Sequence, residues 1–79
     1  MKNLQIYNEA FLKIFNIENQ QLENLNYQSI ETWDSVGHMA LIAELEKNFD
    51  IEMDIDDIIE FSDYLKGKDI LKKYDVNFD

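Results

Sequence analysis

The chain has 79 residues, with 7 Lys, no Arg, 17 Asp plus Glu and one His, for a formal net charge of −10. A surface of this charge repels phosphate, which argues against nucleic acids and anionic membranes and favours basic partners. At this length we expect one domain, residues 1–79, and no autonomous enzyme, because so short a chain cannot build a deep site that excludes water. Without Cys and with one His, the residues themselves offer no disulfide, thiolate or zinc chemistry.

The first predicted element is a helix over about residues 3–15. The chain has no Pro and only two Gly to interrupt helices, and apolar residues recur here at helical spacing. These residues are Leu4, Tyr7, Phe11, Ile14 and Phe15. We expect the three aromatic ones to lie in the core. The pattern fades over residues 17–34, which predicts a long connection held by a few apolar contacts.

The second predicted helix covers about residues 35–49, and its polar residues Glu44, Glu46 and Lys47 are expected to face water. Its apolar stripe consists of Val36, Met39, Ile42, Leu45 and Phe49. Residues 50–55 then alternate acidic and apolar side chains, as a strand would. A lone strand could not pair its backbone groups, so we predict a loop there.

Two shorter helices are predicted to complete the chain. The third covers about residues 56–61, and the fourth follows a break over residues 62–67. Their apolar markers are Ile58, Ile59 and Phe61 in the third helix and Ile70, Leu71 and Tyr74 in the fourth, whose last turn carries Lys72 and Lys73. The expected fold is therefore all-α, with four helices, a long connection between the first two and a short third helix.

The strongest local motif is Asp34-Ser35 at the start of the second helix. The first N–H groups of a helix lack partners within it, and the helix dipole is positive there, so a phosphate attached to Ser35 would be favoured. The simpler interpretation is that Asp34 or Ser35 is only an N-cap. The motif also lies in the acidic part of the chain. Residues 31–65 contain eleven acidic residues and one basic residue, Lys47, and so hold a net charge of −10.

The motif and its surroundings resemble the phosphopantetheine-binding carrier proteins of the acyl carrier family. The resemblance covers essentially the whole chain. It rests on Asp34-Ser35-Val36, on Met39, Ile42, Leu45, Glu46 and Phe49-Asp50-Ile51, and on Ile55, Ile58 and Phe61. It implies a four-helix bundle that is not itself an enzyme and in which a separate phosphopantetheinyl transferase attaches 4′-phosphopantetheine to Ser35. An acyl or aminoacyl group would then be carried as a thioester on the thiol of that cofactor.

The resemblance also implies roles for the neighbours of Ser35. Asp34 would assist recognition by the transferase, while Val36 and Met39 would flank the point where the cofactor leaves the protein. The partners would be an acyl-loading ligase or synthase and acyl-transfer enzymes with basic docking surfaces. The acids expected to meet them are Glu44, Glu46, Asp56, Asp57 and Glu60, with Asp54 nearby.

The start of the second helix departs from the carriers of fatty-acid synthesis. Val36 stands where Leu is most common, and residues 37–40 lack the acids that those carriers often have. A dedicated biosynthetic pathway is therefore the expected setting. Gly37 costs about 1 kcal/mol of helix propensity relative to Ala, and we expect it to allow close approach of a partner or of the cofactor.

Two other chemistries are disfavoured. A serine hydrolase built on Ser35 and His38 would need a base, an oxyanion hole and a nucleophile elbow on a sheet, none of which the sequence indicates, so His38 is expected at the surface or beside the cofactor and Trp33 in the packing. A calcium loop starting at Asp50 fails because its sixth and twelfth positions hold Ile55 and Phe61.

The main alternative to a carrier is an acidic helical module that binds a basic protein without any cofactor. Such a module needs Ser35 only as a cap, so replacing it with Asp or Asn would be nearly harmless. With either function we expect a monomeric, cytoplasmic protein with no membrane insertion, since the chain has neither a leader pattern nor a stretch of about 18 apolar residues.

Overall fold

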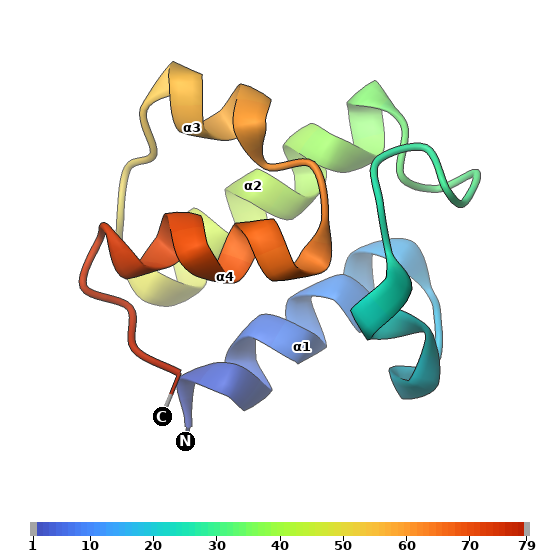
Figure 1. Ribbon diagram of the computed structural model, residues 1–79, viewed down its shortest axis with the longest axis horizontal. Coiled ribbons are helices and arrows are strands. Elements are labelled where there is room, and N and C mark those ends of the chain that lie inside the picture. The colour runs from blue at the N-terminus through green and yellow to red at the C-terminus, as the bar shows by residue number, and fades with distance from the viewer. Residues whose placement is uncertain (1, 79) are drawn as a thin grey trace.

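The computed structural model describes residues 2–78, and these are mostly helical, which confirms the predicted all-α class (Figure 1). Within this range there is no strand, only an isolated bridge between Asn26 and Asp63. The elements are α1 (Asn3–Phe15), the 3-10 helix η1 (Asn19–Asn24), α2 (Ser35–Phe49), α3 (Ile55–Glu60) and α4 (Tyr64–Lys72).

The two longest helices begin and end where the sequence predicts. Both end in a residue with a left-handed backbone, Asn16 after α1 and Asp50 after α2, each with φ 55°. Short polar side chains tolerate this conformation better than other non-glycine residues. The connection between the two helices holds a short helix that was not predicted, η1, which buries Leu22.

The two shorter helices differ from their predicted bounds. α3 starts one residue earlier than predicted and stops before Phe61, which is buried in the core. The predicted break over residues 62–67 is wrong, because α4 already begins at Tyr64, where the preceding Asp63 accepts the Lys66 N–H at 2.6 Å. Gly67 therefore lies inside a helix. A Cβ there would come within 2.3 Å of the Phe61 and Tyr7 side chains, so its absence lets α4 pack closely.

The interior is filled by aromatic rings from several elements. The predicted core residues Tyr7, Phe11 and Phe15 are all buried, which confirms that prediction. Phe11 packs edge-on to Tyr7 and Phe15 stacks on Trp33, with ring centroids 4.9 and 5.1 Å apart. The Tyr7 hydroxyl donates a hydrogen bond of 2.6 Å to the carbonyl oxygen of Tyr64 in α4. Burial raises the pKa of Tyr7 well above its ordinary value, so the hydroxyl stays protonated.

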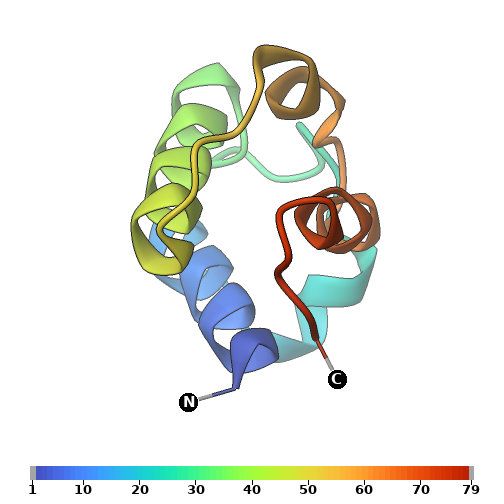
Figure 2. The same ribbon diagram turned by 90° about the vertical axis from the view of Figure 1, so that its left-hand side faces the viewer.

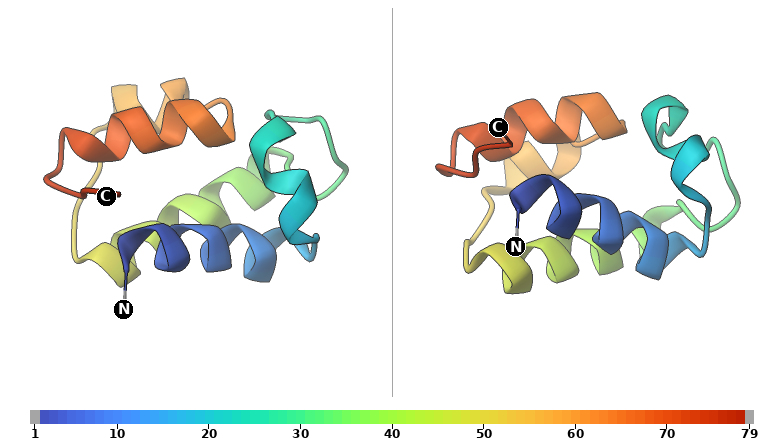
Figure 3. Two further views of the ribbon diagram at one scale, coloured as in Figure 1. Left: turned by 60° about the horizontal axis from the view of Figure 1, so that its bottom comes forward. Right: turned by 90° about the horizontal axis from the view of Figure 1, so that it is seen from below.

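The helices surround this interior (Figure 2). α1 contacts α2, and the views from below show α4 running across on the other side of the core (Figure 3). The chain ends lie together, because the Asn3 side chain donates to the carbonyl oxygen of Asn77 at 2.9 Å. Val76 is buried and Phe78 packs against the core, so these two residues hold the C-terminal segment onto the helices.

Candidate functional site

Asp34 is the N-cap of α2 and leaves Ser35 as the first helical residue. The Asp34 carboxylate accepts the Gly37 N–H at 2.8 Å, and the first intrahelical bond runs from the His38 N–H to the Asp34 carbonyl oxygen at 2.8 Å. The Ser35 residue is exposed. Its hydroxyl is therefore not needed as the cap of this helix, and it lies at the positive end of the helix dipole.

Gly37 serves contact within the chain, at variance with its expected role toward a partner or cofactor. A Cβ at this position would lie 1.9 Å from the Thr32 carbonyl oxygen, so the long connection presses directly against the first turn of α2. The same Thr32 donates its hydroxyl to the Phe15 carbonyl oxygen at 3.1 Å. The connection is thus anchored to the end of α1 and to the start of α2, which fixes the position of Ser35.

A pocket of about 390 Å³ opens between α2 and α3 beside Ser35. Most of its wall is apolar, and both helices contribute to it. The lining residues are Tyr27, Ser35, His38, Met39, Ile55, Ile58, Ile59, Phe61 and Ser62. We refer to this pocket as the α2–α3 groove.

Large apolar side chains lie exposed around the α2–α3 groove. Val36 is 77% exposed, Ile55 70% and Ile59 71%, and Met39 is also exposed. Buried apolar surface stabilises a fold, so a cluster of apolar side chains left in water is typical of an interaction site. Val36 and Met39 thus lie beside Ser35 as expected, whereas Ile55 was expected in a loop and Ile59 only as part of the third helix.

His38 lies in the packing at the base of the groove. Its ring is only partly exposed, with Nδ1 3.0 Å from the Trp33 indole nitrogen and Nε2 2.7 Å from the Ile58 carbonyl oxygen. It is not a free surface group. Trp33 is fully buried, which confirms its expected role as a packing anchor.

The expected role of Asp57 in docking is wrong, because only 6% of this residue is exposed. Lys73 and Tyr74, which follow α4, both donate hydrogen bonds to its carboxylate. The hydrogen bond from Lys73 is the main cause that lowers the pKa of Asp57, and the bond from Tyr74 adds to it. The same bond raises the pKa of Lys73. Asp57 is thus an internal link that ties α3 to the C-terminal segment.

Glu44 and Glu46 are also engaged within the chain. Glu44 forms an ion pair of 3.1 Å with Lys13 of α1, and Glu46 accepts the Met53 N–H at 2.9 Å. Both residues are only partly exposed, so neither simply faces water. Of the five acids expected to meet a partner, Asp56 and Glu60 remain exposed, and both lie on α3 next to the groove.

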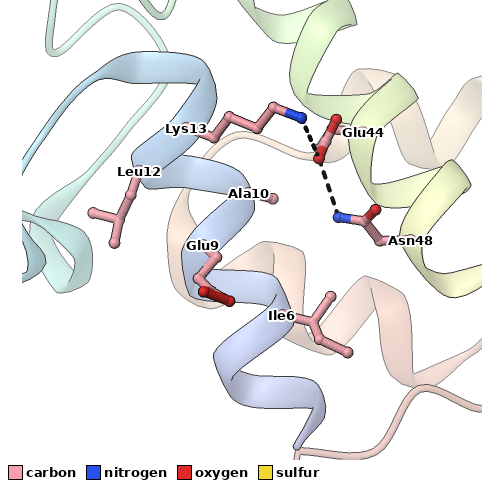
Figure 4. Close-up of a pocket in the computed structure, with 7 residues that line it drawn as sticks. All are labelled: Ile6, Glu9, Ala10, Leu12, Lys13, Glu44 and Asn48. Carbon is pink, nitrogen blue, oxygen red and sulfur yellow. Dashed lines mark hydrogen bonds and ion pairs between the residues drawn. The ribbon is translucent and has the colours of Figure 1, made fainter. Parts of the chain in front are cut away.

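A second groove lies between α1 and α2, and it carries a different set of side chains (Figure 4). It encloses about 680 Å³ and is lined by Ile6, Glu9, Ala10, Leu12, Lys13, Glu44 and Asn48. Glu44 accepts from Lys13 across the groove and from Asn48 one turn further along α2. Burial of the Glu44 carboxylate raises its pKa, but these hydrogen bonds and the charges of Lys13 and Lys47 together hold the pKa below its ordinary value. We refer to this second groove as the α1–α2 groove.

No family model, curated protein or solved structure matches this chain. Among residues 2–78, no helix is both long and apolar enough to cross a membrane. Functional inference therefore rests on the geometry around Ser35.

The α3 contribution to the groove was the part of the site that sequence reasoning missed. Ile55, Ile59 and Tyr27 line the groove, but none was named as a site residue. A signal exists in the sequence, because Ile55, Ile58 and Ile59 all fall within a segment otherwise made of acids. Only the packing of α3 against α2 shows that this short helix presents some of them to solvent rather than to the core.

Proposed function

We propose that the protein is an acyl carrier protein in which 4′-phosphopantetheine is attached to Ser35. Attachment would join the Ser35 hydroxyl oxygen to the phosphorus of the phosphopantetheinyl group of coenzyme A. The adenosine bisphosphate part of coenzyme A would leave, and the hydroxyl proton would pass to a base of the transferase. The thiol of the bound group would supply the chemistry by holding an acyl or aminoacyl cargo as a thioester.

The observation that carries this proposal is that Asp34, and not Ser35, caps the start of α2. Asp34 caps α2, so the exposed Ser35 hydroxyl has no capping role to explain its presence at the first turn. A non-covalent acidic module would need Ser35 only as a cap. The neighbouring groove adds support, because its apolar wall offers a long flexible ligand on Ser35 a surface to contact.

The proposal includes the finer description of the fold as a four-helix bundle of the acyl-carrier type. Four α-helices, a long connection between α1 and α2 and a short α3 support it. In this description, α2 presents Ser35 at one end of the bundle, and α3 forms the wall opposite Met39.

Partner enzymes would contact the exposed apolar residues around Ser35 first and the acids beside them second. Val36, Met39, Ile55 and Ile59 form the apolar centre of this docking surface. Asp56 and Glu60 would provide its acidic rim toward Lys and Arg of the transferase and of acyl-loading and acyl-transfer enzymes. The acids of the rim would mainly speed association, while the apolar centre would supply affinity.

Intact-mass measurement after incubation with coenzyme A and a broad-specificity phosphopantetheinyl transferase tests the proposal. The wild-type chain should gain one phosphopantetheinyl group, and Ser35→Ala should gain none. Ser62→Ala is the matched control, since Ser62 lines the same groove and should be modified like the wild type. Absence of any gain in a folded wild-type sample with several transferases would favour the non-covalent acidic module instead.

A further inference from the structure

The His38 ring joins two distant parts of the chain through both of its nitrogens. The indole nitrogen of Trp33 lies 3.0 Å from Nδ1, and the Ile58 carbonyl oxygen lies 2.7 Å from Nε2. An indole N–H can only donate, so Nδ1 must be an unprotonated acceptor. Nε2 then carries the proton and donates it to the Ile58 carbonyl. One neutral tautomer therefore satisfies both partners.

Both partners depend on this ring. Trp33 is 0% exposed, so without an acceptor its indole N–H would be buried and unsatisfied. The Ile58 carbonyl belongs to the last turn of α3, where carbonyl groups have no partner within the helix. His38 thus acts as a side-chain cap at the end of α3 and as the acceptor for the indole of the connection.

α3 needs such outside contacts because it has only six residues. Helices this short have little stability of their own in water. Asp57 ties α3 to Lys73 and Tyr74, and His38 ties its last turn to α2. Since α3 supplies the Ile wall of the α2–α3 groove, these two links set where that wall stands relative to Ser35.

We propose that His38 is a positioning residue whose neutral ring, through its bonds to Trp33 and Ile58, holds α3 at the spacing from α2 that forms the groove beside Ser35, and that a second proton on the ring breaks the bond to Trp33 while leaving the bond to Ile58. Protonation would place an N–H at Nδ1, directly facing the Trp33 indole N–H. Two donors cannot bond to each other, so the contact to Trp33 is lost. The inference rests on the contacts of His38 and does not require that Ser35 be modified.

Few other titratable groups lie around His38. Tyr27 meets the ring edge-on at a centroid distance of 5.5 Å, Asp34 precedes it by one turn, and α3 contributes Asp57 and Glu60. Asp34 accepts the Gly37 N–H, and Asp57 is bound by Lys73 and Tyr74. His38 is the only His in the chain, so the imidazole signals of the protein come from this ring alone.

The test is NMR of the full chain during a pH titration. At pH 8 the His38 ring should be a single neutral tautomer with the proton on Nε2, and the Trp33 indole N–H should be protected from exchange. As the ring takes up its second proton, the protection relative to an unprotected indole should fall at least tenfold, because the indole loses its acceptor while Nε2 still donates to Ile58. Unchanged protection through the whole imidazole titration would overturn the proposal.

Two variants separate hydrogen bonding from ring packing. His38→Gln keeps one acceptor and one donor at the end of its side chain and does not titrate, so it should retain indole protection down to pH 5. His38→Phe keeps a ring but has neither group, so it should lack indole protection at every pH and should shift the Ile58 and Ile59 methyl signals, because the bond to Ile58 is gone. Equal protection in the two variants would overturn the proposal. If His38→Phe does not fold, the wild-type titration and His38→Gln still decide the question.

Discussion

Two grooves border different sides of α2, and they differ in what holds their walls together. The α1–α2 groove is the larger, about 680 Å³ against about 390 Å³, but the ion pair of Lys13 with Glu44 crosses it, and Asn48 adds a further bond to Glu44. The α2–α3 groove has a mainly apolar wall and has Ser35 at its edge. Under the proposed function the smaller groove is the site, because it combines accessible apolar surface with an exposed serine hydroxyl.

The largest effect is expected from a charge placed in the apolar centre of the docking surface. Ile59→Lys should lower the kcat/KM of a loading enzyme for the carrier at least tenfold, because it puts a buried charge into the interface. The free energy of unfolding should hardly change, since Ile59 is 71% exposed in the folded protein. Leu65→Lys is the matched control, because Leu65 is 58% exposed but lies on α4 outside the groove. Equal losses in both variants would remove the distinction between the groove and other apolar surface.

A smaller but clear effect is expected where the connection meets α2. Gly37→Ala forces a Cβ to within 1.9 Å of the Thr32 carbonyl oxygen, so backbone must move. We expect the free energy of unfolding to fall by about 1–3 kcal/mol despite the better helix propensity of Ala. Urea denaturation measures this change. A variant as stable as the wild type would show that the connection does not need this close contact to hold Ser35 in place.

The hydrogen bonds that tie Asp57 of α3 to Lys73 and Tyr74 should be visible in the pH dependence of the free energy of unfolding. The folded-state pKa of Asp57 is lowered, first by the hydrogen bond from Lys73, so its stabilising effect is present above the unfolded-state pKa of about 4 and is lost as the pH falls toward the folded value. Asp57→Asn should lower the melting temperature by several degrees at pH 7. Thermal scans from pH 7 to pH 2 should also show a shallower fall in the variant. Parallel curves for both proteins would contradict this assignment.

The smallest effect is expected in the α1–α2 groove. Lys13→Met removes the Lys13–Glu44 ion pair, whose Lys is mostly exposed, so the unfolding free energy should change by less than about 1 kcal/mol. Attachment of phosphopantetheine at Ser35 should proceed at the wild-type rate, which a time course of intact mass would show. A several-fold slower attachment would mean that this groove also takes part in recognition.

Local periodicity was sufficient for the long helices but not for the short ones. The apolar spacing over residues 3–15 and 35–49 predicts α1 and α2 to the residue, and it places Asp34-Ser35 at the start of a helix. η1 escapes prediction because its six residues, NQQLEN, hold only one apolar side chain. Gly67 suggested a break because Gly usually disfavours helices, whereas here it makes room for the Phe61 and Tyr7 rings.

The composition of the site could be predicted only in part, for a similar reason. Ser35 and Met39 lie one turn apart on one helix, so the sequence alone brings them together. The burial of Asp57 depends on Lys73 and Tyr74, which lie 16 and 17 residues further along the chain. The contact of His38 with Ile58 likewise spans 20 residues. Contacts at such separations follow from how the helices pack, and no local pattern encodes them.

The most direct test of the central claim is to locate the added group on the chain. After treatment of the wild type with coenzyme A and a transferase, cleavage after Lys13 and Lys47 gives a peptide of residues 14–47 that holds Ser29 and Ser35, while Ser62 lies in another peptide. Fragmentation of the modified peptide should place phosphopantetheine on Ser35 alone. A group found on Ser29 or Ser62, or no modified peptide at all, would contradict the account.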